Sequence, residues 1–140
     1  MVDVRLFREE DRAAVVQLWN EVFPHPPPWN DPETDISRKL LVQRDLFFVA
    51  ASGGHLVGTA LAGFDGHRGW VYYVAVHPEQ RRRGVGRALM AEVESVLATR
   101  GCHKVNLQVR STGRDAVAFY ERLGYRVEDH ISLGKLLVPS

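Results

Sequence analysis

The stretch that decides the fold is VAVHPEQRRRGVGRALM, residues 74–90, where an apolar strand pattern runs into three arginines, two glycines and a helical pattern. The first turn of a helix is the positive end of the peptide dipole, so the arginines at 81–83 lie at the unfavourable end. Gly84 and Gly86 each lower helix propensity by up to about 1 kcal/mol relative to alanine. The arginines and the glycines thus both destabilise the start of this helix, which indicates that these residues are present for a reason other than helix stability.

A strand, a tight turn and a helix start together predict a site for an anion. The first amides of a helix have no partner within the helix and point outward. Glycines let an anion approach the backbone, and arginines add charge-assisted bonds to it. The alternative is a solvated basic helix start without a ligand. The glycines favour a phosphate, but Leu89 replaces the third glycine of a dinucleotide-binding loop and the P-loop pattern is absent.

Composition places the chain among ordinary globular proteins. It has 140 residues, 45% hydrophobic and 25% charged, with a formal net charge of +1, which predicts a single domain over residues 1–140 and gives no global attraction to nucleic acid or membranes. The single Cys102 cannot form an internal disulfide, and charges occupy residues 1–11 where a signal peptide would be apolar. We expect a cytoplasmic protein.

Periodicity predicts the elements before the arginine stretch. Residues 2–7 alternate like a strand, and acids at 9–11 begin a helix. Asp31 is the expected N-cap of a second helix that has Pro32 at its first position. Residues 46–64 are uncharged and long enough to span a membrane, but the glycine turn in their middle favours a hairpin. An Asp65-Gly66 turn then leads into a central strand, residues 70–76.

Periodicity also predicts the elements that follow the arginine stretch. A helix runs from Gly84 to a C-cap at Gly101. Its expected inner stripe is Val85, Leu89, Val93 and Val96. A strand follows at 104–109, and Thr112 and Asp115 predict a capping box for a last helix closed by Gly124. Two short strands, 125–128 and 131–137, complete an α+β layer structure.

Two motifs together resemble those of the GNAT superfamily of acyl-CoA-dependent N-acetyltransferases. Residues 74–90 look like its pyrophosphate loop, and AVAFYERLGY, residues 116–125, resembles its second motif. The order β-α-α-β-β-β-α-β-α-β-β extends the resemblance over essentially the whole chain. PWNDPETDISRK, residues 28–39, and DGHRG, residues 65–69, further resemble an uncharacterised bacterial branch of these enzymes.

The resemblance implies a fold and a cosubstrate site. The fold is a mixed, mostly antiparallel sheet flanked by helices and splayed between its fourth and fifth strands, with acetyl-CoA along the splay. Pantetheine would pair with the strand backbone and pyrophosphate with the loop amides. Independently of the resemblance, we expect no metal, because no two histidines are spaced i, i+4 on a helix and only His103 lies near Cys102. The implied cofactor-binding residues are Val74, Val76, Arg81, Arg82, Arg83, Gly84, Val85, Gly86, Arg87, Gly113 and Phe119.

The resemblance also implies a catalytic residue. An amine would attack the thioester directly, and an amide near Val74 would polarise the carbonyl oxygen. Tyr120 would protonate the leaving thiolate, which suits a phenol that is protonated at neutral pH. The alternative for Tyr120 is a packed core aromatic on the stripe of Phe119. Gly113 stands where the second motif usually carries asparagine. Trp70 and Gln108 stand where relatives place a catalytic carboxylate, and neither can accept a proton.

Substrate-binding candidates come from loops and from the central strand. Trp29, with its neighbours at 30 and 31, is either a pocket wall or part of a proline-braced loop, and both interpretations stay open. Asp65 and His67 could contact an amine, but a turn is the simpler role. Tyr72 lies on the strand itself. The substrate-binding candidates are Trp29, Asn30, Asp31, Asp65, His67 and Tyr72.

The function expected from these features is acetyl transfer from acetyl-CoA to a primary amine, on a small molecule or a peptide. With no carboxylate at the usual position, water polarised by Tyr72, Asn106 or Asp65 would carry the amine proton away. The alternatives are a CoA sensor without activity and a small nucleic-acid binder. The clustered arginines disfavour nucleic acid, no membrane partner is expected, and a homodimer is left open.

Overall fold

The computed structural model describes residues 2–138 of the chain. These residues fall into two compact units, Met1–Leu107 and Gln108–Ser140. The first unit contains the sheet, the arginine loop and three of the helices, and the second contains the last helix. The single domain expected over residues 1–140 stays a prediction.

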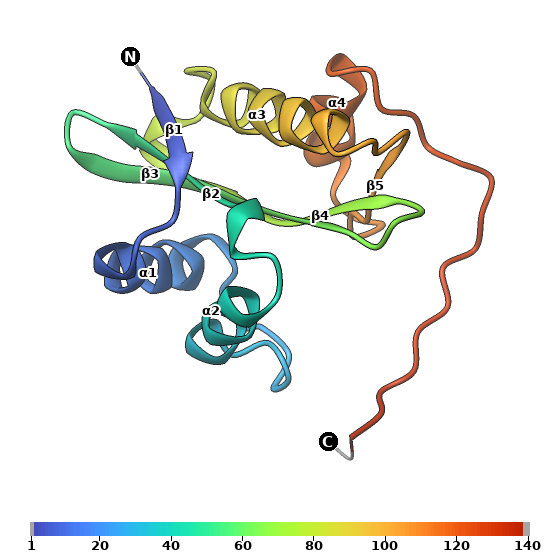
Figure 1. Ribbon diagram of the computed structural model, residues 1–140, viewed down its shortest axis with the longest axis horizontal. Helices are drawn as coiled ribbons and strands as arrows, with labels where there is room; N and C mark the ends of the chain where they lie inside the picture. Colours follow the sequence, from blue (N-terminus) through green and yellow to red (C-terminus); the bar gives the residue numbers. More distant parts are fainter. Residues whose placement is uncertain (1, 139–140) are drawn as a thin grey trace. The chain divides into compact units, whose positions relative to one another are not determined.

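The first unit is built on a five-stranded mixed sheet (Figure 1), as expected. Its strands, in spatial and chain order, are β1 Asp3–Leu6, β2 Phe47–Ser52, β3 His55–Phe64, β4 Gly69–Val76 and β5 Val105–Leu107. Each neighbouring pair from β1 to β4 is antiparallel, whereas β4 and β5 are parallel. The uncharged segment considered for a membrane is the β2–β3 hairpin, and no helix within residues 2–138 is both long and apolar enough to cross a bilayer.

Three helices cover the two faces of this sheet. The helices α1 Arg12–Val22 and α2 Pro32–Leu41 lie on one face, and α3 Val85–Thr99 lies on the other (Figure 1). Short 3-10 turns precede α1, β2 and α3. These turns are η1 Glu9–Asp11, η2 Arg44–Leu46 and η3 Pro78–Gln80.

Local signals set the ends of two helices as predicted. The Asp31 carboxylate accepts a hydrogen bond from the Thr34 amide at 3.0 Å, and Pro32 follows it at the first helical position of α2. At the end of α3, Gly101 has φ +85°. The Cys102 amide donates to the Leu97 carbonyl at 3.0 Å, which closes the helix as a Schellman motif.

The face of α3 that meets the sheet differs by one position from the prediction. Val85, Leu89 and Val93 are buried as expected, but the next buried side chain is Leu97 and Val96 is only partly buried. The interval of four from Val93 to Leu97 keeps both on the inner face, because a helix turns every 3.6 residues.

Gly58 on β3 lets α3 approach the sheet closely. A Cβ at this position would lie 2.9 Å from the Val85 Cγ1, 3.0 Å from the Leu89 Cδ1 and 3.0 Å from the Ala75 carbonyl oxygen. The last of these atoms is backbone and cannot move aside, so this contact requires glycine.

The opposite face of the sheet carries an aromatic core beneath α1 and α2. Its buried members are Val15, Leu18, Trp19, Ile36, Phe47, Val49, Leu61 and Ala75. The Trp19 ring stacks on the Tyr73 ring with centroids 3.9 Å apart, so the core reaches β4 directly from α1. Burial of these side chains supplies the main stabilisation of this layer.

In the second unit the last helix begins later than its expected capping box. The helix α4, Arg114–Arg122, has Gly113 at its N-cap, and no side chain caps it. The capping box of Thr112 and Asp115 is therefore wrong, because the cap falls one residue beyond the threonine. A Cβ at Gly113 would lie 2.9 Å from the Val109 Cγ1, which explains the glycine.

Three expected strand assignments are also corrected. The strand at 104–109 is shortened to Val105–Leu107, and residues 125–128 and 131–137 form no strand. A strand exists only where a neighbour satisfies its backbone, and apolar alternation alone does not provide one. Ile131 is 88% exposed and Leu133 is 92% exposed, so these side chains lack the buried face that their alternation predicted.

Lys39 is a buried cation in α2. Its side chain donates to the Ala62 carbonyl of β3, and its ammonium lies 5.5 Å from the centre of the Tyr72 ring. Removal from water lowers the pKa of Lys39 to about 8. The Lys39 side chain thus reaches from α2 to β3 and β4. Burying its charged ammonium costs free energy of desolvation.

We expect this cost to appear in the pH dependence of stability. Between pH 8 and about 10.5 the unfolded chain binds the Lys39 proton and the folded chain does not, so stability rises with pH. The free energy of unfolding of the wild type should gain up to about 3 kcal/mol relative to Lys39→Met across this range. Urea titrations at each pH measure the free energy of unfolding. Lys135→Met, at an exposed lysine, is the control for the loss of one positive charge. A pH-independent difference would contradict the prediction.

Candidate functional site

The loop between β4 and α3 has the backbone of an anion site. Arg82 has φ +65° and Gly84 has φ +80°, so two left-handed residues alternate with ordinary ones. Such alternation turns successive amides toward a common concave side. A left-handed conformation costs an arginine roughly 1–2 kcal/mol, and strain of this kind gathers at functional sites.

The start of α3 adds amides to this loop. The Ala88 amide donates to the Gly84 carbonyl at 3.0 Å, which is the first bond of the helical ladder. The amides at 85–87 precede that bond and have no partner within the helix. They lie at the positive end of the helix dipole, which favours an anion.

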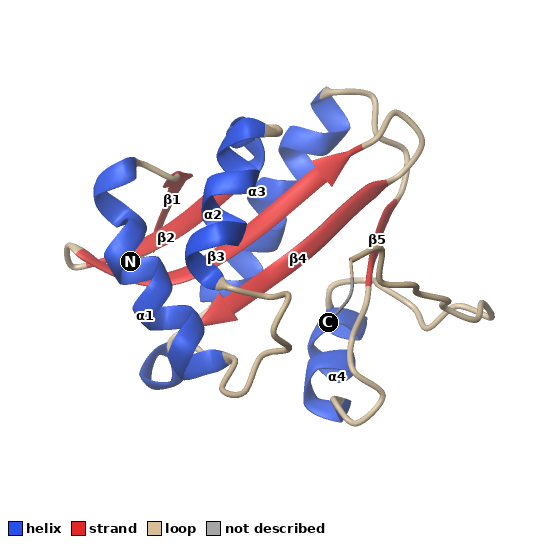
Figure 2. Ribbon diagram, turned by 90° about the horizontal axis from the view of Figure 1, so that it is seen from below, coloured by secondary structure: helices blue, strands red, loops and turns tan. Residues whose placement is uncertain are grey.

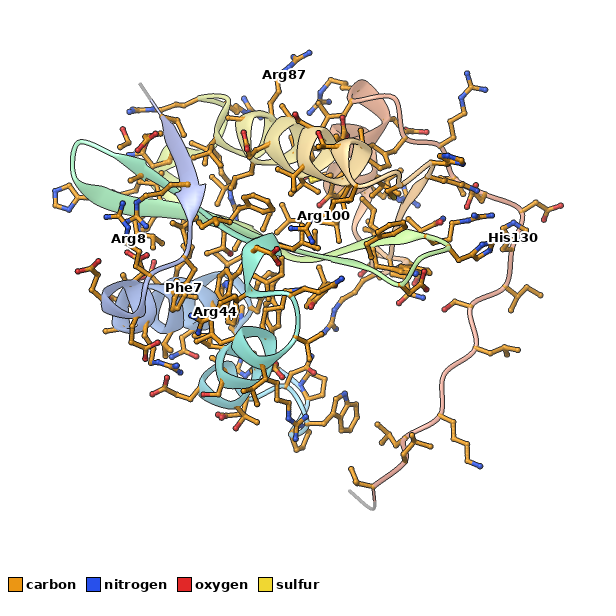
Figure 3. The ribbon with its side chains drawn as sticks, viewed as in Figure 1. Phe7, Arg8, Arg44, Arg87, Arg100 and His130 are labelled. Carbon is orange, nitrogen blue, oxygen red and sulfur yellow. The ribbon has the colours of Figure 1, made fainter. Side chains whose placement is uncertain are left out.

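The arginines of the loop are available to a ligand. Arg81, Arg82, Arg83 and Arg87 are exposed, and none of them forms an ion pair with a residue in the range 2–138. Figure 3 shows Arg87 extending outward from α3. Four free guanidinium groups around unpartnered amides form a cluster suited to phosphate oxygens.

The sheet opens beside this loop. β5 pairs with β4 from Gly69 to Val71 only, and β4 continues to Val76 (Figure 2). Within the first unit, residues 72–76 therefore have no strand on their β5 side, as the splayed sheet predicted. An open strand edge offers its amides and carbonyls to an extended ligand.

A β-bulge interrupts β4 at this open edge. The register shifts between the pairs Thr59–Ala75 and Leu61–Tyr72, so Ala60 alone faces the two residues at 73 and 74. Tyr73 adopts φ +51°, which is rare for an aromatic residue. A bulge bends a strand and redirects its groups, and bulges are frequent next to active sites.

The bulge places two successive tyrosines on one face of the sheet. Tyr72 meets Lys39 of α2, and Tyr73 stacks on Trp19 of α1, with the two tyrosine centroids 6.3 Å apart. Neighbouring residues of a regular strand would point to opposite faces. Tyr72 remains 44% exposed, so the face under α1 and α2 presents an accessible phenol.

Hydrogen bonds hold this bulge, and sequence reasoning missed the residues that make them. The Trp19 indole donates to the Thr59 hydroxyl at 2.8 Å, and that hydroxyl donates to the Tyr73 carbonyl at 2.9 Å. The Tyr73 hydroxyl donates to the Asp35 carboxylate at 2.5 Å. Burial and this carboxylate raise the pKa of Tyr73 above its ordinary range. The signal available in the sequence was Thr59, a polar residue within an apolar strand pattern, which needs a hydrogen-bond partner when it is buried.

The loop before α2 carries the expected wall residues. Trp29 is 48% exposed, and the Asn30 amide donates to the Pro27 carbonyl at 2.9 Å. The Asp31 carboxylate accepts from both the amide and the hydroxyl of Thr34, and these bonds lower the pKa of Asp31. Asp31 therefore has a structural role as a helix cap, whereas Trp29 remains a candidate.

Asp65 and His67 form the turn before β4. The Asp65 carboxylate accepts from the amides of His67 and Arg68, each at 2.7 Å, and these bonds lower the pKa of Asp65. The strand that follows, β4, runs for eight residues from Gly69 to Val76, where the arginine loop begins. At about 3.3 Å per residue, the two ends of β4 lie about 23 Å apart, so this turn is not part of the arginine loop's site.

In the second unit, Tyr120 lies near the end of α4. Its ring packs edge-on against Phe119, with centroids 5.0 Å apart, and against Tyr125 at 5.8 Å. The Tyr125 amide donates to the Tyr120 carbonyl, and Gly124 has φ +97°, so the ring contact is the apolar part of a Schellman motif. Burial raises the pKa of Tyr120 to about 12.

Comparison with known proteins agrees with this geometry. The model of the acetyltransferase (GNAT) family matches residues 12–125. Acetyltransferase ECA0875 of Pectobacterium atrosepticum is 46% identical over 137 residues, which are 98% of this chain and 96% of that protein.

Solved structures share the fold. AAC(6')-Iy in complex with a bisubstrate analog has a TM-score of 0.82 at 18% identity and covers 99% of each chain. The ribosomal-protein-S18-alanine N-acetyltransferase of Escherichia coli has a TM-score of 0.74 at 25% identity, over 89% of this chain and 77% of that one. Because the family model covers most of the sequence and a relative with 46% identity aligns with nearly all of it, this chain belongs to the GNAT family of acetyltransferases.

Proposed function

We propose that this protein transfers the acetyl group of acetyl-CoA to a primary amine. The observation that carries the proposal is the arginine loop, with its unpartnered amides and free arginines, at the end of a strand with an open edge. The family supports acetyl transfer, and AAC(6')-Iy, which shares the fold, was solved in complex with CoA.

Acetyl-CoA has two parts that match two features of the first unit. A pyrophosphate carries negative oxygens that suit the amides at 82–87 and the guanidinium groups of the loop. Pantetheine is an extended arm with amide groups, which suits pairing with the open edge of β4 near Val74 and Val76. Each of these features lacks a partner in the first unit, which is why we assign them to the same ligand.

We expect acetyl-CoA to stabilise the fold through the arginine loop. A ligand that binds only the folded state adds roughly 2.7 kcal/mol at one hundred times its dissociation constant. Thermal unfolding should shift upward with acetyl-CoA, and much less with free pantetheine, which lacks the pyrophosphate. Arg82→Ala tests the loop, and the exposed Arg38→Ala serves as a control for a lost charge. An unchanged thermal midpoint at millimolar acetyl-CoA would contradict the proposal.

The proposed reaction is direct aminolysis of the thioester. The neutral amine nitrogen forms a bond to the carbonyl carbon, the carbon–sulfur bond breaks, and the electron pair leaves on sulfur. The amine loses one proton and the thiolate gains one, so no oxidant or metal is needed. In our proposal the group that donates to the leaving thiolate is the hydroxyl of Tyr120, whose elevated pKa of about 12 keeps it protonated at every physiological pH.

The elevated pKa also defines how Tyr120 acts. If the leaving thiol resembles cysteine, with a pKa of about 8.5, complete proton transfer from this phenol is uphill by about 5 kcal/mol. Tyr120 therefore stabilises the developing thiolate mainly as a hydrogen-bond donor, and solvent restores the balance of protons afterwards.

We expect Tyr120→Phe to slow turnover and to leave the fold intact. The ring contacts with Phe119 and Tyr125 persist, because only the hydroxyl is removed. One positioned acid contributes about 10²- to 10⁴-fold, so kcat should fall within that range and the Kd for acetyl-CoA should not change. Release of free thiol measures kcat. An unchanged kcat would leave Tyr120 as a packing residue of the helix end.

The amine proton leaves through water in our proposal. The carboxylates of Asp31 and Asp65 are engaged by local donors that lower their pKa values, which makes both poor bases. The side chains proposed to polarise the water are Tyr72 and Asn106, because the Asp65 carboxylate is held within its own turn.

A water relay predicts that the rate follows the ionisation of the substrate amine. For a lysine-like amine, kcat/KM should keep rising past pH 9. Replacing each acid by its amide should leave turnover largely intact. The variants are Asp31→Asn, Asp65→Asn, Glu79→Gln and Glu128→Gln, with His67→Gln beside them. A variant that binds acetyl-CoA normally and loses a thousandfold in kcat would identify a dedicated base instead.

A further inference from the structure

The bulge in β4 is a strained point that its surroundings hold in place. Tyr73 keeps φ +51° within a strand, a conformation that costs an aromatic residue roughly 1–2 kcal/mol. The contacts that act on this residue include the ring stack with Trp19, the hydroxyl bond to Asp35 and the carbonyl bond from Thr59. Strain persists only where neighbours determine the conformation. Here the neighbours hold both the backbone carbonyl and the side chain of Tyr73.

The direction of the Thr59 hydrogen bonds is unambiguous. An indole nitrogen can only donate, so the Thr59 hydroxyl must accept from Trp19. The hydroxyl has one proton, and the carbonyl of Tyr73 can only accept it. Thr59 is fully buried on β3, so water does not compete for either bond. Trp19 therefore orients the threonine, and the threonine holds the Tyr73 carbonyl.

Holding this carbonyl also aims the next amide. A peptide unit is planar and trans, so the C=O of Tyr73 and the N–H of Val74 point in opposite directions. The carbonyl points to Thr59 on β3, and the Val74 N–H therefore points away from β3. On that side β5 has ended after its last pair, at Val71. The amide is directed to the open edge of the sheet.

We propose that Thr59 is a positioning residue for acyl transfer. The family resemblance implies that an amide near Val74 donates to the thioester carbonyl as negative charge develops on its oxygen. The new step is that the Thr59 hydroxyl fixes the peptide plane between Tyr73 and Val74 and so aims this amide. The inference rests on the proposed function. Removal of one preorganised donor of this kind lowers kcat about 10²- to 10³-fold. A donor that is still present but points in the wrong direction should lower kcat by less than that.

The test compares Thr59→Val with Thr59→Ser. Valine keeps the shape and removes the hydroxyl, whereas serine keeps the hydroxyl and removes a methyl. We expect Thr59→Val to lower kcat about 10- to 100-fold, with no change in the Kd of CoA, which lacks the thioester carbonyl. Thr59→Ser should keep kcat within about threefold of the wild type. Equal kcat values for both variants and the wild type would overturn the inference.

A stability control and a spectroscopic signal separate positioning from simple destabilisation. Val15→Ala opens the same buried cluster without touching the bulge, so it destabilises the protein and should leave kcat unchanged in folded samples. The infrared stretch of ¹³C-labelled acetyl-CoA should lie at lower frequency when bound to the wild type than to Thr59→Val. Val15→Ala and Thr59→Ser should keep the wild-type frequency. A wild-type frequency in Thr59→Val contradicts the role of Thr59.

The same experiments distinguish failure of this inference from failure of the proposed function. A wild-type protein that releases no thiol with any amine, and shows no shift of the carbonyl stretch, would refute acetyl transfer itself. An active wild type with an unaltered Thr59→Val variant would refute only the role of Thr59.

Discussion

The end of β5 pairing at Val71 is the constraint on which the rest of the site depends. Up to that point β4 is an interior strand whose backbone is satisfied on both sides. Beyond it, five residues of β4 offer one edge within the first unit, and an edge of this kind needs a partner. The chain continues from that edge directly into the arginine loop, so the unpaired backbone and the positive charges are consecutive in sequence. We propose that one extended ligand with an anionic end satisfies both.

Local strain is concentrated in the same segment. Tyr73, Arg82 and Gly84 are all left-handed within a dozen residues, and two of the three are not glycine. The elements beneath the segment are correspondingly well packed: α3 approaches β3 closely at Gly58, and Trp19 stacks on Tyr73 from the other face. A rigid layer on each side allows the backbone between them to keep conformations that it would not adopt alone.

Much of the fold could be predicted from the sequence, because most of its signals are local. Asp31 caps its helix, Gly101 ends another, and the glycines at 53 and 54 turn a hairpin, as expected. The errors occur where local structure depends on contacts with other residues. Residues 131–137 alternate like a strand but have no neighbour to pair with, and the cap of α4 falls on Gly113 where Val109 leaves no room for a side chain.

The geometry of the candidate site could be predicted only in part, for the same reason, and the roles of its residues stay predictions. The arginine loop shows itself in the sequence because its charges and glycines oppose helix propensity. The bulge at Tyr73 does not, since its register depends on β3 and its brace on Thr59 and Trp19, which are 14 and 54 residues away. The bulge also turns Tyr72 and Tyr73 to the face covered by α1 and α2, beside Lys39 and Asp35. The helices α1 and α2 thus contact the face that carries the two phenols, while the arginine loop leads into α3 on the opposite face. The sheet therefore separates the tyrosines from the loop that we propose binds an anion.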